Sequence, residues 1–250
     1  MTETTETTHF GFREVPTDDK QKLVGEVFTS VASRYDLMND LMSLGVHRLW
    51  KRHFVFTARV RAGYQVLDLA GGTGDIAALL YPQLGATGSV TVADINAAML
   101  SCGRDRLLDE GKLARSRFVQ ANAEALPFAD ATFDLVTMAF GLRNVTDKMS
   151  ALRSIRRVLK PGGRVLVLEF SQLRLPALRP AYDWYSFNLL PALGQRVAGD
   201  AESYQYLAES IRRHPNQETL TGMLDEAGYV LTRCRNLSAG LVAIHEGVRP

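Results

Sequence analysis

The amino-acid sequence predicts an α/β fold in which a mostly parallel sheet carries helices on both faces, and two observations support this. Between residues 65 and 169, five short apolar runs are separated by three segments of helical periodicity, a pattern typical of successive strand–helix–strand units. The first run ends in a glycine-rich turn, Ala70-Gly71-Gly72-Thr73-Gly74, before a helical run. Rossmann-like, doubly wound sheets hold nucleotide-type ligands at such a corner.

Seven strands can be placed from these patterns. They are expected over Gln65–Leu69, Ser89–Asp94, Arg117–Gln120, Phe133–Ala139, Arg164–Glu169, Tyr229–Asn236 and Leu241–His245. Helices are expected over Ile76–Gln83, Ala97–Glu110, Lys148–Leu159 and Gln217–Ala227. The turn Lys160–Gly163 ends the third helix, because proline cannot continue a helix and glycine supplies the turn. Ser238–Gly240 reads as a hairpin turn, so one of the last two strands is expected to run antiparallel to the rest.

The chain is expected to form one domain with additions at its start and after the fifth strand. Residues 1–20 are polar and predict a flexible N-terminus, and residues 21–250 predict a single domain. Helical spacing covers Lys22–Ala32 and His47–Arg59. The segment 170–213 is rich in Tyr, Trp, Phe, Leu and Pro, which predicts an inserted helical cap. These additions either cover a ligand mouth or are plain packing, and the sequence leaves both open.

Composition excludes several classes of function. The net charge of +2 is too small to indicate a nucleic-acid surface. Two cysteines and five histidines without ligand spacing predict neither a disulfide framework nor a metal site. The start, Met1–Thr8, lacks the apolar core of a signal peptide, and no apolar run reaches the roughly 18–20 residues that span a bilayer. We therefore expect a cytoplasmic protein.

The glycine turn predicts a ligand with a cationic part. Gly72 and Gly74 let the backbone approach a ligand and take positive φ. Asp68 lies at the start of the turn, where a carboxylate would repel a pyrophosphate. The last glycine is followed by Asp75 and Ile76, without the further glycine of a dinucleotide fingerprint. A turn with a purely structural role is the alternative.

Polar residues follow the next strands. Asp94 ends the second strand about twenty residues after the glycine turn, where an acid can bind ribose hydroxyls; a helix N-cap is the alternative. Asn122 and the backbone of Ala123 are candidates for contacts with adenine, and a simple turn is the alternative. Arg143 and Asn144 follow the fourth strand at the edge where ligands bind; a surface arginine is the alternative.

Taken together, these residues resemble a class I S-adenosyl-L-methionine-dependent methyltransferase, and more narrowly the ubiquinone/menaquinone biosynthesis C-methyltransferase family (UbiE). The resemblance covers nearly the whole chain. Its specific segments are His9–Phe12, Val31–Asp40, His47–Arg52, Leu67–Asp75, Phe140–Val145 and Tyr206–Arg212.

The resemblance implies a site and a reaction. Contacts with S-adenosyl-L-methionine are implied at Thr73, Asp94, Asn122 and Ala123, and at position 139, where the family often has Ser and this chain has Ala139, so that a hydroxyl contact cannot form. The implied reaction transfers the methyl group to a ring carbon of a polyprenyl quinol. We expect Arg143 to stabilise the ring oxyanion, since arginine is a poor base, and Asn144 to orient that oxygen. Tyr35, Asp36 and His47 are candidates for closing the site.

The resemblance also implies partners. The substrate that the resemblance implies is 2-polyprenyl-6-methoxy-1,4-benzoquinol, demethylmenaquinol or both. A groove for its tail is expected from Tyr182, Trp184, Tyr185, Phe187, Leu189 and Leu190, with a packed cap or a dimer face as the alternatives. Peripheral membrane contact, other quinone-biosynthesis proteins and a homo-oligomer are expected partners. The rivals are a different methyltransferase, an NAD(P)-dependent oxidoreductase and a non-catalytic subunit.

Overall fold

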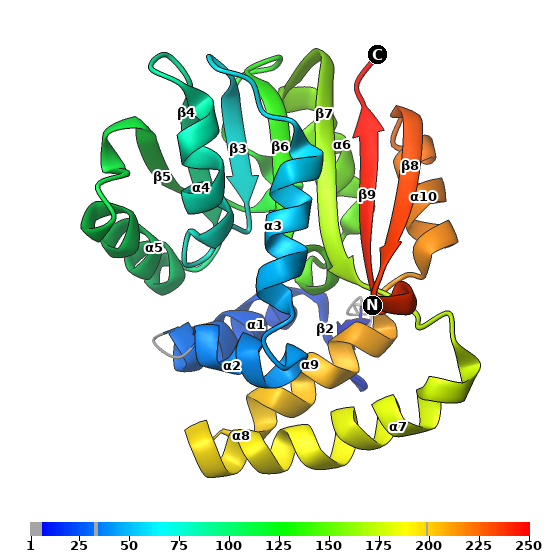
Figure 1. Ribbon diagram of the computed structural model, residues 1–250. Helices are drawn as coiled ribbons and strands as arrows, with labels where there is room; N and C mark the ends of the chain where they lie inside the picture. Colours follow the sequence, from blue (N-terminus) through cyan, green and yellow to red (C-terminus); the bar gives the residue numbers. More distant parts are fainter. Residues whose placement is uncertain (1–6, 33–34, 199) are drawn as a thin grey trace, which may run out of the picture.

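The structure is a computed structural model that describes residues 7–32, 35–198 and 200–250, without the side chains of residues 35, 36, 197 and 198. Its centre is a seven-stranded sheet in the order β5-β4-β3-β6-β7-β9-β8 (Figure 1). The strands are β3 (Gln65–Leu69), β4 (Ser89–Asp94), β5 (Ser116–Gln120), β6 (Phe133–Ala139), β7 (Leu159–Phe170), β8 (Val230–Leu237) and β9 (Val242–Val248). β9 pairs antiparallel with both β7 and β8, so the antiparallel strand expected from the hairpin at 238–240 is confirmed.

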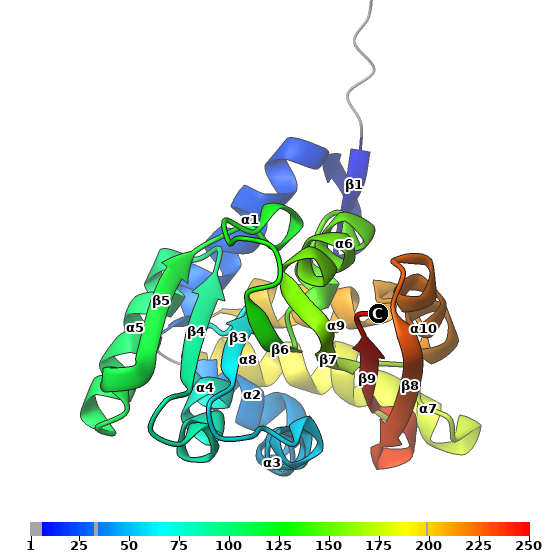
Figure 2. The same ribbon diagram turned by 90° about the horizontal axis from the view of Figure 1, so that it is seen from above.

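Helices cover both faces of the sheet, as Figure 2 shows from above. They are α3 (His47–Ala58), α4 (Asp75–Leu80), α5 (Ala97–Asp109), α6 (Lys148–Val158) and α10 (Gln217–Glu226). Successive side chains of each strand point to opposite faces of the sheet. Val66 and Leu135 belong to one core with Phe54 of α3, whereas Leu67 and Val136 belong to another core with α6 and α10. Burial on both faces explains why these strands read as continuous apolar runs.

β7 begins earlier than the sequence predicts. The expected strand starts at Arg164, but pairing already joins Leu159 to Phe133 before a register shift. The backbone N–H of Gly162 donates to the carbonyl of Arg249 at 2.8 Å. The residues of the turn at 160–163 are thus part of β7, and the C-terminal end of the chain pairs with them. The local sequence could not indicate this distant pairing.

The N-terminal region contains a hairpin that the sequence analysis does not predict. β1 (Thr7–Phe10) pairs with β2 (Arg13–Pro16), and α1 (Thr17–Val31) starts directly after it. The missed strands are only four residues each, too short for a periodic signal. α2 (Tyr35–Ser43) then leads into α3. The flexibility of residues 1–20 stays a prediction.

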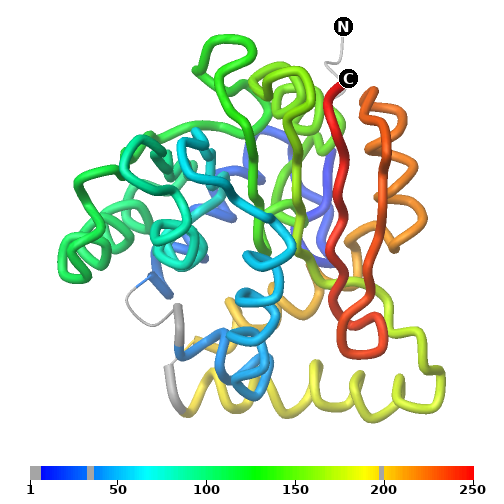
Figure 3. The backbone as a smooth tube through the Cα atoms, turned by 45° about the horizontal axis from the view of Figure 1, so that its top comes forward, coloured from blue at the N-terminus to red at the C-terminus, as the bar shows by residue number. Residues whose placement is uncertain are grey.

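The segment after β7 is helical. It comprises α7 (Arg179–Trp184), a π-helical turn (η7, Tyr185–Leu189), α8 (Leu190–Ala198) and α9 (Ala201–Arg213). α8 packs against α9 and also contacts α2, below the carboxyl ends of the parallel strands in Figures 1 and 3. Among the described residues, no helix is both long and apolar enough to cross a membrane.

Candidate functional site

A cavity opens at the carboxyl ends of β3, β4 and β6, where the doubly wound sheet predicts a ligand site. It encloses about 1100 Å³ including its open mouth. Its walls come from the β3–α4 loop, the ends of the three strands and the inner side of α1. The lining includes Val24, Gly25, Phe28, Lys51, Asp68, Gly71, Gly72, Thr73, Asp94, Asn122, Ala123, Ala139, Gly141 and Asn144.

The glycine turn brings its backbone to the cavity wall. Gly72 has φ +49° and Gly74 has φ +76°, a conformation that residues with a Cβ rarely adopt. A Cβ on Gly74 would lie 2.7 Å from Leu107 Cδ1 of α5. Gly74 is also the N-cap of α4, so the first N–H groups of the helix point towards the cavity end of the turn. The glycine turn therefore packs against α5 on one side and faces the cavity on the other.

Asp68 is fully buried at the end of β3 and lines the cavity. Its Oδ1 accepts a hydrogen bond from Thr137 Oγ1 at 2.9 Å, and its Oδ2 accepts one from the backbone N–H of Ala77 at 3.1 Å. Burial raises the pKa of Asp68 to about 7 despite these two donors. A cation placed beside this carboxylate would stabilise its ionised form.

Asp94 lines the cavity with both oxygens held by backbone. Oδ2 accepts from Gly72 N and Oδ1 from Asn96 N, each at 2.9 Å. The N-cap of α5 is Asn96, whose side chain accepts from Met99 N at 3.1 Å. The N-cap role, which was the alternative for Asp94, therefore belongs to Asn96. Each carboxylate oxygen of Asp94 keeps a lone pair for a ligand.

The loop after β5 and the end of β6 complete the wall. Asn122 accepts from Glu124 N at 3.0 Å as the N-cap of a short helical turn, Ala123–Ala125, and both Asn122 and Ala123 line the cavity. Thr73 and Ala139 line it as well. Asn122 thus caps a short helical turn, as its alternative of a simple turn would allow, and it also lies beside the cavity.

Arg143 and Asn144 follow β6 but differ in position. Arg143 is not among the lining residues: its side chain is 2% exposed, and Nη1 donates to Glu169 Oε1 at 3.0 Å. The same Nη1 also donates to the carbonyl of Phe140, and Glu169 accepts from the backbone N–H of Arg143. Asn144 does line the cavity, and its Oδ1 accepts from Tyr206 Oη at 2.9 Å.

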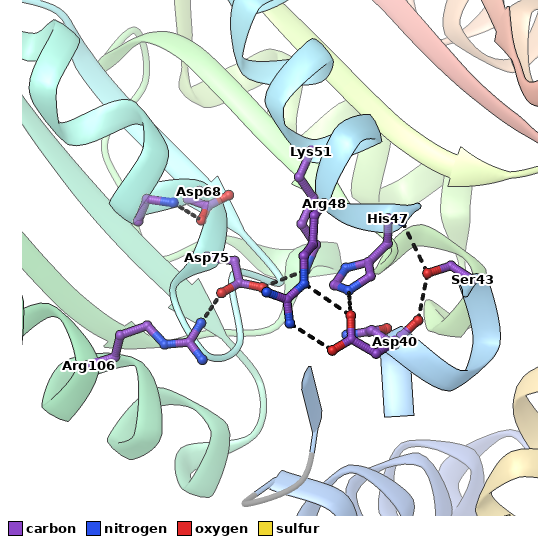
Figure 4. A network of polar contacts seen from close by, with 10 residues as sticks. Asp40, Ser43, His47, Arg48, Lys51, Asp68, Asp75 and Arg106 are labelled. Atoms are coloured by element: carbon purple, nitrogen blue, oxygen red, sulfur yellow. Dashed lines mark hydrogen bonds and ion pairs between the residues drawn. The ribbon is translucent and has the colours of Figure 1, made fainter. Parts of the chain in front are cut away.

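A network of ions that the sequence analysis missed lies beside the glycine turn (Figure 4). Lys51 is 6% exposed, lines the cavity and pairs with Asp75, which also pairs with Arg106 of α5. The only signal was that Lys51 belongs to the segment His47–Arg52 quoted for the resemblance. The charge of Lys51 also acts on Asp68 and lowers its pKa slightly against the larger effect of burial.

His47 lies further out in the same network (Figure 4). Its Nε2 contacts Asp40 Oδ1 at 2.9 Å, and Arg48 donates to both oxygens of that carboxylate. These hydrogen bonds lower the pKa of Asp40 to about 2, whereas burial lowers the pKa of His47. His47 does not line the cavity. The side chains of Tyr35 and Asp36, its fellow candidates for closing the site, lie outside the described residues.

The model of the ubiE/COQ5 methyltransferase family matches residues 16–249. The chain is 63% identical to the ubiquinone/menaquinone biosynthesis C-methyltransferase UbiE of Xanthomonas campestris pv. campestris, over 98% of this chain and 97% of that protein. The chain belongs to the ubiE/COQ5 methyltransferase family. A protein of the same name from Stenotrophomonas maltophilia is 61% identical over 97% of this chain and 96% of that protein.

Solved structures agree with the fold of this ubiE/COQ5 family member. A SAM-dependent methyltransferase from Aquifex aeolicus superposes with a TM-score of 0.62 at 16% identity, covering 86% of this chain and 98% of that one. The predicted Rossmann-like class I fold is therefore confirmed. At that identity the likeness shows the fold alone, so the roles of individual site residues stay predictions.

The expected groove in the cap is not part of the cavity of this family member. None of Tyr182, Trp184, Tyr185, Phe187, Leu189 and Leu190 lines it. The hydroxyl of Tyr185 donates to the carbonyl of Leu41, which joins the cap to α2, and Leu190 is buried. Trp184 is 61% exposed and faces outward. The cap residues thus divide into a packed side and an exposed side.

Proposed function

We propose that the protein transfers the methyl group of S-adenosyl-L-methionine to a ring carbon of a polyprenyl quinol, in ubiquinone biosynthesis, menaquinone biosynthesis or both. The name carried by relatives at 61–63% identity supports this substrate class. The observation on which the proposal rests is the cavity with Asp68 and Asp94 at the ends of adjacent strands and the glycine turn between them.

The lining residues fit this methyl donor from end to end. Asp94 can accept hydrogen bonds from the two ribose hydroxyls, because each oxygen keeps a lone pair. Asn122 and the backbone of Ala123 would hold the adenine, with Thr73 and Ala139 in van der Waals contact. Close approach at Gly72 and Gly74 admits the ligand to the turn.

The amino-acid end of the donor has two complementary partners in this cavity. The buried carboxylate of Asp68 would bind its ammonium group, and the ammonium of Lys51 would bind its carboxylate. Both groups are buried in the wall of the cavity, and Lys51, which pairs with Asp75, would bind the donor's carboxylate through another of its N–H groups. The bound donor supplies an electrophilic methyl group on a sulfonium.

The reaction needs an electron-rich ring carbon. When a quinol hydroxyl loses its proton, the ring carbon attacks the methyl group, the C–C bond forms and the S–CH₃ bond breaks with its electron pair on sulfur. Loss of the ring hydrogen as a proton restores the aromatic ring, and the ring oxygen regains a proton to give the quinol. The protein contributes alignment of the two reactants and stabilisation of the ring oxyanion.

In our proposal, Asn144 and Arg143 both stabilise the ring oxyanion. Asn144 lines the cavity and can donate from its amide to the ring oxygen. Arg143 lies behind the wall with Glu169, so we place its charge beside Asn144 and not in direct contact with the ring. Tyr35 stays a candidate for closing the site over the ring.

A methyl-transfer assay tests the proposal. Protein is incubated with methyl-labelled donor and, separately, with a prenylated methoxybenzoquinol and demethylmenaquinol kept reduced under anaerobic conditions. We expect label in the ring of one or both products. Donor binding in calorimetry without label in either ring would contradict the quinol assignment, and absence of donor binding would contradict the whole proposal.

The prenylated substrate also suggests a membrane partner. Four large apolar side chains on the cap are exposed, namely Leu175, Leu178, Trp184 and Leu189. Arg179, which lies between Leu178 and Trp184 in the sequence, suits anionic headgroups, whereas Arg174 pairs with Glu218. We propose that this face of the cap rests on the bilayer, to be tested by sedimentation with neutral and anionic vesicles and with Trp184→Ser. Self-association and contact with other quinone-biosynthesis proteins stay predictions.

A further inference from the structure

The side chain of Asn144 is fixed by a residue distant in sequence. Its Oδ1 accepts a hydrogen bond from Tyr206 Oη, 62 positions away, on α9. An amide has one oxygen and one NH₂ group, so occupation of the oxygen leaves Nδ2 as the group that Asn144 can offer in the cavity. Among the described residues, none accepts a hydrogen bond from Nδ2.

Tyr206 is itself held firmly. It is 5% exposed, and its ring stacks on Phe10 of β1 with centroids 4.2 Å apart and planes 17° from parallel. The tip of the hairpin is anchored on the same helix, since Phe12 N donates to Glu209 Oε2 at 2.9 Å. Tyr206 and Glu209 are three residues apart and share one face of α9. The N-terminal hairpin thus clamps the part of α9 that reaches Asn144.

The hydroxyl of Tyr206 is suited to donate throughout the working pH range. Burial raises its pKa above the usual value, and the nearby charges of Arg143 and Glu169 oppose each other in their effect. Tyr206 therefore stays a neutral phenol. A neutral phenol beside Oδ1 donates to it and keeps the amide in one orientation.

We propose that Tyr206 is a positioning residue for methyl transfer: it holds the amide of Asn144 so that Nδ2 donates to the ring oxygen of the acceptor. Phe10 and Glu209 keep Tyr206 in place, which gives the N-terminal hairpin a part in the acceptor side of the site. This inference rests on the proposed function and names the residue that sets the geometry of its oxyanion contact.

The first test is Tyr206→Phe, which keeps the stacked ring and removes only the hydroxyl. We expect kcat to fall roughly tenfold, corresponding to one hydrogen bond, while the dissociation constant of S-adenosyl-L-methionine changes less than twofold. The loss should be largest at low pH and should shrink as pH rises, because the quinol then ionises without help. A purely structural defect would not change with pH in this way.

Three further variants complete the test. If Tyr206 acts through Asn144, the double variant Tyr206→Phe/Asn144→Ala should be no slower than Asn144→Ala alone. Tyr204→Phe removes a hydroxyl from the same helix at a residue that does not line the cavity, and it should leave kcat and its pH profile unchanged. Additive losses in the double variant, or an unchanged kcat in Tyr206→Phe, would overturn the inference. Absence of turnover in the unmodified protein would instead count against the proposed function.

Discussion

Replacing Asp68 by Asn is expected to stabilise the ligand-free protein at alkaline pH. Burial raises the pKa of this carboxyl from 3.8 to about 7. One unit corresponds to about 1.4 kcal/mol, so the ionised form costs roughly 4 kcal/mol above pH 7. Asparagine removes the charge, but it has one acceptor oxygen for the donors Thr137 and Ala77, and a lost hydrogen bond costs about 1–2 kcal/mol. The net gain is about 2 kcal/mol.

The contribution of Asp68 to the stability of the fold depends on pH. In the unfolded chain the carboxyl ionises near pH 3.8, whereas the folded protein retains the proton up to about pH 7. The unfolded state therefore binds fewer protons in this window, and the contribution of Asp68 to stability falls as pH rises through it. The advantage of the variant should grow between pH 4 and pH 7 and vanish or reverse at the acid end.

Thermal unfolding with and without the methyl donor is the assay. For a chain of this length, 2 kcal/mol corresponds to a rise in Tm of about 4–8 °C at pH 8. Donor in excess should raise the Tm of the unmodified protein and hardly change that of Asp68→Asn. Asp134→Asn is the control, because Asp134 accepts from Gln65 N and Lys160 Nζ away from the cavity. A variant no more stable at pH 8, or one stabilised equally by donor, would refute the assignment of Asp68.

Four further outcomes are expected. Asp94→Asn should weaken donor binding in calorimetry by roughly 10–100-fold, the cost of a charge-assisted hydrogen bond; unchanged affinity would exclude the ribose contact. Arg143→Ala should lower kcat much more than donor affinity, at a temperature where unfolding scans show it folded, and equal loss of both would remove its role in the reaction. Gly103→Ala should lower both stability and donor affinity, because its Cβ would lie 2.6 Å from the carbonyl of Gly72. Gly222→Ala, with open space around it, should instead gain about 0.5–1 kcal/mol.

The parallel core of the fold could be predicted because its signals are local. The strands β3, β4 and β6 are apolar runs bounded by turn residues, and the predicted limits of all four strands from β3 to β6 agree with the structure to within one residue. The hairpin around Ser238 was equally visible. By contrast, β1 and β2 are held by pairing with each other and by contacts with α9, such as that between Phe10 and Tyr206. Contacts at such separation leave no periodic pattern in the chain.

The candidate site was predictable in outline for a related reason. Residues that follow parallel strands meet at one edge of the sheet, so Asp68, Asp94 and Asn144 could be grouped without coordinates. Whether each side chain lines the cavity or lies behind its wall could not be predicted from its place after a strand. Arg143 and Asn144 are adjacent in sequence, yet one pairs with Glu169 behind the wall and the other lines the cavity. That difference arises from β7 and α9, which the residues around position 143 do not reveal.

The charge balance of the cavity gives a reason for product release. Among the residues that the structure describes, its lining contains four carboxylates, those of Asp68, Asp75, Asp94 and Glu124, and the single ammonium of Lys51. Asp75 is neutralised by Lys51 and Arg106, and Glu124 accepts from two backbone N–H groups. Asp68 and Asp94, whose pKa values burial raises, are the carboxylates left to a cationic ligand. Methyl transfer removes the positive charge on sulfur, so the product loses part of the attraction that held the donor.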